Sequence, residues 1–136
     1  MRSWRAAATI AVLVLTGCGL DVESPDLFQV TRSGAGGQRL TLLVNDAGTI
    51  SCDGGKPKSL PDPLLLQARD LSTSLNADVK SKLKFPVNGR SVFSYRVKVQ
   101  NGSVTFPDTS ASTRKELAQL ELFVVQAAAS PCGLRS

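Results

Sequence analysis

The chain has 136 residues, of which 42% are hydrophobic and 20% are charged, and its net charge is +5. This length allows one small domain, and this balance of apolar and charged residues excludes a disordered chain. The chain has no histidine, which excludes serine–histidine and cysteine–histidine nucleophiles, imidazole zinc sites and a histidine general base.

The N-terminus has the three-part order of a secretory signal. Arg2 and Arg5 precede an uncharged apolar run over residues 6–15, and small residues follow. As a helix this run would rise about 15 Å, roughly half the thickness of a hydrocarbon core of about 30 Å. We therefore expect residues 1–17 to be a signal peptide and not a permanent transmembrane helix.

The sequence Leu15-Thr16-Gly17-Cys18 resembles the lipobox of bacterial lipoproteins, in which leucine and two small residues precede an acylated cysteine. The resemblance covers only the N-terminal signal. It implies that Cys18 becomes the lipidated first residue of the mature chain. Two or three acyl chains would anchor the chain stably to the outer face of the cell membrane, or to an outer membrane if the organism has one. The alternative is an ordinary cleaved signal, which would leave Cys18 as a plain thiol or a disulfide partner.

The mature chain would be less basic than the whole chain. Loss of Arg2 and Arg5 leaves a net charge of +3, which is too small to indicate a nucleic-acid partner and would tolerate an anionic membrane surface. The segment 18–26 is acidic, contains a proline and lacks apolar periodicity, so we expect a short tether between the lipid and the domain.

Acylation of Cys18 would explain the odd number of cysteines, because Cys52 and Cys132 would then remain for one disulfide. In the chain-entropy model, closing the loop of 80 residues between them stabilises the fold by about 4.5 kcal/mol. The alternatives are two separate buried thiols or a redox-active pair, although the Cys-x-x-Cys spacing of such pairs does not occur.

The first half of the predicted domain begins with strands. Residues 27–32 and 39–44 flank the glycine-rich turn 33–37 and predict a β-hairpin, and residues 49–52 predict a third strand. A loop follows over 53–61. Asp62 then predicts a helix N-cap with Pro63 at the first helical position. The helix carries an apolar stripe of Leu64, Ala68, Leu71 and Leu75, and Asn76 and Asp78 mark its expected end.

The second half predicts another hairpin and another helix. Residues 91–100 and 103–106 alternate apolar and polar side chains around Asn101-Gly102, which favours a type I′ turn. Residues 113–129 predict a helix with a capping box formed by Thr113 and Glu116, ended by Pro131 and Gly133. The element order β-β-β-α-β-β-α indicates an α+β fold for residues 27–136. We expect one domain with a small antiparallel sheet of about five strands and two helices packed on one face.

The sequence contains no recognisable set of catalytic groups. Residues 81–84 and 112–115 match Ser-x-x-Lys, but the partner motifs Ser-Asp-Asn and Lys-Thr-Gly do not occur. The acidic residues fall in the tether, the loops and the helices, and no pattern pairs two of them for acid–base hydrolysis or gives the ligand spacing of a calcium loop. We therefore expect no catalytic residues, no metal site and no cofactor.

A basic cluster is the best candidate binding surface, although a charged solvated face is the simpler interpretation. Its expected partners are anionic lipid headgroups, an acidic wall polymer or an envelope protein. The cluster consists of Lys80, Lys82, Lys84, Arg90, Arg96 and Lys98.

Three functional hypotheses remain open. The first is a membrane-anchored envelope lipoprotein with a non-enzymatic binding or scaffolding domain. The second is a tethered proteinase inhibitor that uses the proline-rich loop 53–63, since the layout around Cys52 is loosely similar to that of the bacterial subtilisin-inhibitor family. The chain departs from that family in having one available disulfide and a terminal helix, and no inhibitory residue is carried over. The third is a cell-wall hydrolase.

Overall fold

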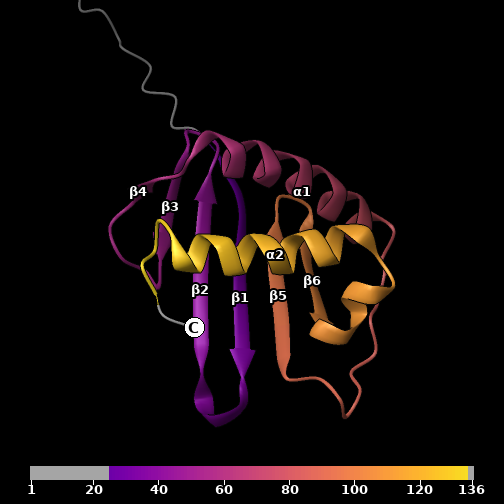
Figure 1. Cartoon of the computed structure of the whole chain (residues 1–136). Helices are drawn as coiled ribbons and strands as arrows, with labels where there is room; N and C mark the ends of the chain where they lie inside the picture. Colours follow the sequence, from indigo (N-terminus) through magenta and orange to yellow (C-terminus); the bar gives the residue numbers. More distant parts are fainter. Residues whose placement is uncertain (1–24, 135–136) are drawn as a thin grey trace, which may run out of the picture.

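The computed structural model describes residues 25–134, which form a six-stranded antiparallel sheet and two helices (Figure 1). The order across the sheet is β4-β3-β2-β1-β5-β6. This architecture confirms the α+β fold expected from the sequence. The elements are β1 (Asp26–Gly34), β2 (Arg39–Asn45), β3 (Thr49–Cys52), β4 (Lys58–Ser59), α1 (Asp62–Lys80), β5 (Phe93–Val99), β6 (Gly102–Pro107) and α2 (Lys115–Ala129), with short 3₁₀ turns η1 (Ala35–Gly37) and η2 (Asp108–Ser112).

Helix α1 carries the chain from one edge of the sheet to the other. Strands β1 to β4 follow one another as hairpins, and β5 then pairs with the free side of β1, with Val30 opposite Val97. Strand β1 therefore lies between β2 and β5, and β6 forms the far edge. The predicted tether overlaps this sheet, because Asp26 already pairs with Asn45.

One hydrophobic core lies between the sheet and the helices. Alternate residues of β1, such as Phe28 and Val30, point toward the helices and are almost fully buried. The rings of Phe28 and Phe123 meet edge to face with centroids 5.5 Å apart, which ties α2 to the centre of the sheet. In Figure 1, α2 crosses in front of β2, β1 and β5, and α1 runs along the upper end of the strands.

Helix α1 is longer than predicted. Its N-cap is Pro61 and not Asp62, and the helix continues through Asn76 and Asp78 to Lys80. Both polar side chains have partners that compensate for their low helix propensity. Asn76 Nδ2 donates to the Ser72 carbonyl at 2.9 Å, and Asn76 Oδ1 accepts the Asn101 N–H at 3.0 Å. The side chain of Asp78 is buried and accepts a hydrogen bond from Arg114.

The predicted type I′ turn is wrong. Val99 pairs with Gly102, so the two loop residues are Gln100 and Asn101. A type I′ turn needs positive φ at both central residues. In residues 25–134, positive φ outside glycine occurs only at Asp53 and Lys82. The Asn101 N–H is instead bound to Asn76, and Gly102 takes the positive φ of 138°.

The predicted capping box of α2 is also wrong. The N-cap is Arg114, and no side chain caps the first turn. Thr113 Oγ1 donates to the Ser110 carbonyl at 2.7 Å and so completes η2, while Glu116 accepts a hydrogen bond from Arg114 Nε at 2.7 Å. Both members of the expected box therefore have other partners.

Candidate binding groove

An open groove lies between the C-terminal half of α2 and the hairpin end of β1 and β2. Its volume is about 610 Å³, which is within the usual range for small-molecule sites. The groove combines apolar side chains with two arginines and one carboxylate. Its lining consists of Arg32, Gly34, Gln38, Arg39, Leu40, Asp53, Phe93, Val125, Ala128, Ala129 and Leu134.

Arg32 is the central polar residue of this groove, and strand alternation explains its position. Phe28, Val30 and Arg32 lie on the same face of β1, because successive side chains alternate across a strand. Arg32 is opposite Leu40 of β2 and Tyr95 of β5, both of which are buried beneath the helices. A charged side chain thus occupies a position where the pattern calls for an apolar one.

The guanidinium of Arg32 is held by an aromatic ring. Its Cζ atom lies 4.8 Å from the centroid of Phe93, which fits a cation–π contact. The position of the Phe93 ring requires a glycine at residue 34, because a Cβ added to Gly34 would lie only 2.9 Å from the ring. Among residues 25–134, the ion pairs involve Arg69 and Arg114 but not Arg32. Arg32 therefore has ion-pairing capacity facing the groove.

The C-terminal residues form the apolar wall opposite the sheet. The Cys132 N–H donates to the Ala127 carbonyl at 3.0 Å, and the Leu134 N–H donates to the Ala128 carbonyl at 2.8 Å. These bonds fold the chain back over the end of α2. Leu134 and Val125 remain 39% and 53% exposed, so apolar surface faces the solvent at the groove.

A disulfide fixes this wall to the sheet. Cys52 at the end of β3 is joined to Cys132, with 5.9 Å between their Cα atoms. Lys58 Nζ of β4 approaches the carbonyl oxygens of Pro131 and Cys132 at 3.4 and 3.5 Å. The next residue after Cys52, Asp53, lines the groove while its Oδ1 accepts the Thr41 N–H at 2.8 Å.

Three titratable residues, Glu121, Tyr95 and Asp108, interact close to the groove, and Glu121 lies one helical turn before Val125. Glu121 belongs to the same face of α2, and one of its carboxylate oxygens is buried with no hydrogen-bond partner in the described part of the chain. Burial, with a smaller effect of Asp108, raises the pKa of Glu121 to about 7. Burial and the charge of Glu121 also raise the pKa of Tyr95, while Arg32 opposes that rise.

The predicted basic surface is divided between two regions. Lys80 ends α1, and Lys82, Lys84 and Arg90 lie exposed in the segment that leads to β5. Arg96 and Lys98 are exposed on the face of β5 that points away from the helices. The edge strand β6 lies beyond β5, and Phe85 packs on Phe106 of β6 with centroids 6.3 Å apart. No described contact joins the two groups, and neither lines the groove, although Lys98 lines the smaller cavity.

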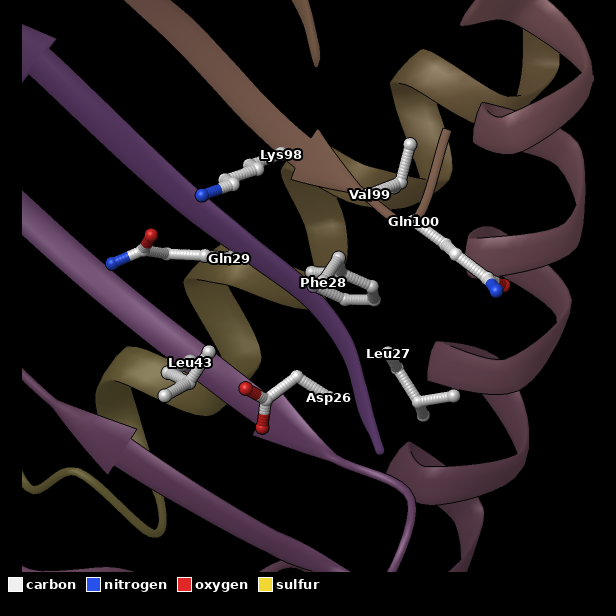
Figure 2. Close-up of a pocket in the computed structure, with 8 residues that line it drawn as sticks. All are labelled: Asp26, Leu27, Phe28, Gln29, Leu43, Lys98, Val99 and Gln100. Atoms are coloured by element: carbon white, nitrogen blue, oxygen red, sulfur yellow. The ribbon is translucent and has the colours of Figure 1, made fainter. Parts of the chain in front are cut away.

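The smaller cavity, of about 290 Å³, lies where β1 bulges between Asp26 and Phe28 (Figure 2). Gln29 and Lys98 are register partners and extend side by side from β1 and β5, with α2 behind the sheet. Its other lining residues are Asp26, Leu27, Phe28, Leu43, Val99 and Gln100. It is half the volume of the groove and offers less enclosure for a ligand.

The carboxylates of Asp78 and Glu116 converge at the start of α2. The sequence did not predict that these two residues lie together. Arg114 donates to Asp78 Oδ1 at 3.0 Å and to Glu116 Oε1 at 2.7 Å. Burial and the neighbouring Glu116 raise the pKa of Asp78 to about 6, against the effect of Arg114. Neither carboxylate lines the groove, so this cluster joins the two helices away from the larger cavity.

The loop 53–63 is exposed but not extended. Cys52 to Gly55 form a turn closed by the Gly55 N–H and the Cys52 carbonyl at 3.0 Å. Lys58–Ser59 form β4, an edge strand that the sequence did not predict, and Leu60 is buried. Only residues 56–57 lie between the turn and the strand, and Lys56 is exposed.

The predicted lipid attachment at Cys18 lies outside the described residues. Within residues 25–134, neither helix is long and apolar enough to cross a membrane. In the same part of the chain, no three acidic or cysteine side chains are grouped so that they could hold a metal ion.

Comparisons with known proteins leave the fold and the groove as the basis for a functional assignment. The chain matches no protein-family profile, and the searches of curated proteins and of solved structures found no significant similarity.

Proposed function

We propose that the chain is an envelope lipoprotein, anchored through Cys18 to the outer face of a membrane, whose domain binds an envelope component without catalysis. The lipobox resemblance of Leu15-Thr16-Gly17-Cys18 supports the anchor. The domain then works close to the bilayer and needs a surface that recognises its partner.

The groove beside α2 is the observation that carries the binding role. It joins a guanidinium that has no ion-pair partner among residues 25–134, an aromatic floor and exposed aliphatic side chains within about 610 Å³. Apolar walls with a few polar groups that fix orientation are the usual composition of a ligand site. The disulfide and the C-terminal hydrogen bonds hold one wall in place, so little conformational entropy is lost when a ligand binds.

Membrane fractionation tests the anchor. Cys18→Ala removes the acyl acceptor, so the exported chain should leave the membrane fraction, whereas Thr16→Ala keeps a small residue in the lipobox and should remain bound. Equal membrane association of the Cys18→Ala chain after export would overturn the anchor.

Photocrosslinking in the native envelope tests the binding role. A photoreactive residue at Val125 lies in the groove, whereas the same residue at Leu122 is equally exposed on α2 but does not line it. A third position, Lys84, samples the basic segment. We expect a defined adduct from Val125 alone. An adduct from Lys84 alone would move the site to the basic surface, and no adduct at any position would overturn the binding role.

The second candidate, a tethered proteinase inhibitor, is favoured by the bracing of residues 53–59. These exposed residues are held between the disulfide at Cys52 and the buried Leu60. Titration of the full chain against a subtilisin-type proteinase discriminates the two functions. Inhibition that Lys56→Ala changes would support the inhibitor, whereas cleavage within 54–57 without inhibition would exclude it.

A further inference from the structure

We infer that the groove beside α2 binds a fatty-acid carboxylate, with the carboxylate on Arg32 and the acyl chain along the wall formed by Val125, Ala128 and Leu134. This inference rests on the proposed binding role and names its ligand class. It depends on three properties of the described residues, which are the charge of the groove, the geometry at Arg32 and the apolar wall.

The charged lining residues favour a ligand with one negative charge. Arg32 and Arg39 contribute two positive charges and Asp53 one negative charge, so a monoanion neutralises the groove. A phosphate monoester carries about −1.5 to −2 near neutral pH and would leave an excess of negative charge. Asp53 Oδ1 accepts the Thr41 N–H, and the ion pairs among residues 25–134 do not join Asp53 to Arg32.

The geometry at Arg32 suits a carboxylate. The ring of Phe93 lies against the guanidinium, and Arg32 also hydrogen-bonds to the Tyr95 hydroxyl. Because a guanidinium has five N–H donors, further donors remain for a ligand. Planar guanidinium groups bind carboxylates through two parallel hydrogen bonds. Arg32 is partly shielded from water, where a charge-assisted pair is stronger than at an open surface.

The apolar wall supplies the contact for an acyl chain. Val125 is 53% exposed and Leu134 is 39% exposed, and Ala128 and Ala129 lie between them along the groove. Each methylene that the wall removes from water contributes about 0.8 kcal/mol. A carboxylate on Arg32 and a chain on this wall therefore use both parts of the groove.

Calorimetric titration of the full chain carrying Cys18→Ala with laurate, below its micelle concentration, tests the inference. We expect one site, and we expect Arg32→Gln to raise Kd at least about tenfold. Arg32→Lys keeps the charge without the fork of donors and should cause a smaller loss. The matched control is Arg96→Gln, which removes the same charge from the opposite face of the sheet and should change Kd by less than about twofold.

A second pair of variants keeps the test valid if Arg32→Gln does not fold. Val125→Asp places a charge on the wall and should abolish laurate binding, whereas Leu122→Asp changes a residue of similar exposure outside the groove and should not. The dodecyltrimethylammonium cation has the same chain length and opposite charge, and we expect no binding.

Three results would overturn the inference. They are the absence of laurate binding, equal binding of the cation, and equal effects of Arg32→Gln and Arg96→Gln. If laurate fails while Val125 still captures a component in the envelope, the ligand class is wrong and the binding role stands. If Val125 captures nothing there, the binding role itself fails.

Discussion

Arg114 Nη2 donates a hydrogen bond to Asp78 Oδ1 at 3.0 Å and thereby joins the start of α2 to the last turn of α1. Asp78 is 4% exposed, so its carboxylate depends on this partner. Asp78→Ala should lower the free energy of unfolding by about 1–3 kcal/mol, because it leaves Arg114 without a helix α1 partner. Urea denaturation measures the loss. The control Asp70→Ala changes an exposed carboxylate on the same helix and should stay within about 0.5 kcal/mol, so equal losses would contradict this role.

Glu121 makes stability depend on pH near neutrality. Its folded pKa of about 7 is above the ordinary value of 4.5, so the folded state binds the proton more tightly than the unfolded state. Its stabilising contribution is complete below pH 4.5, declines between pH 4.5 and 7, and is lost above pH 7. The difference in free energy of unfolding between Glu121→Gln and the wild type should therefore shift with pH. After allowance for solvent screening, this difference should favour the variant by about 1–2 kcal/mol more at pH 8 than at pH 4.5. An unchanged difference between the two proteins at the two pH values would show that Glu121 is not the group responsible.

The disulfide between Cys52 and Cys132 should contribute a large share of the stability. Reduction opens a loop of 80 residues, and we expect a loss of about 2–4 kcal/mol in urea denaturation. The same loss would release Leu134 from the groove wall, so reduction should also weaken laurate binding. Alkylation without reductant should modify neither cysteine in the purified full chain carrying Cys18→Ala. Full modification of both would contradict the bridge.

Neighbouring residues of α2 should differ sharply in their contribution to the core. Phe123 is fully buried against Phe28, whereas Leu122 is 52% exposed. Phe123→Ala should cost about 3–5 kcal/mol because it leaves a cavity in the core. Leu122→Ala should change the free energy of unfolding by less than about 0.5 kcal/mol. Comparable losses for the two variants would mean that α2 is rotated relative to the described packing.

The elements that the sequence predicted well are those with strong local signals. Residues 49–52 form β3 with the expected bounds, because the turn Asn45–Gly48 limits the strand at one end and the change to a glycine-rich loop limits it at the other. The element order along the chain and the antiparallel hairpins β1–β2, β2–β3 and β5–β6 also follow from such local signals. The pairing of β1 with β5 joins distant residues and has no local signature.

The mistakes arise where a tertiary partner replaces a local one. Asn76 and Asp78 have the composition of a helix end, but their partners Asn101 and Arg114 come from distant segments. Strand β4 has two residues, which are too few to form a periodic pattern. Its position depends on hydrogen bonds to β3.

The groove was not predicted from the sequence, although one local signal was present. The alternation of Phe28, Val30 and Arg32 places a charge in an apolar row, and polar residues at such positions often have functional roles. The apolar wall could not be predicted in the same way. It depends on the disulfide and on backbone hydrogen bonds that fold Leu134 back over α2.

Native mass spectrometry of the protein gently extracted from its own membrane tests the central claim most directly. We predict a chain that starts at a diacylated Cys18, together with a bound acyl carboxylate that is lost in Arg32→Gln and retained in Arg96→Gln. A chain without lipid on Cys18, or an adduct that both variants retain equally, would contradict an anchored protein that binds its ligand through Arg32.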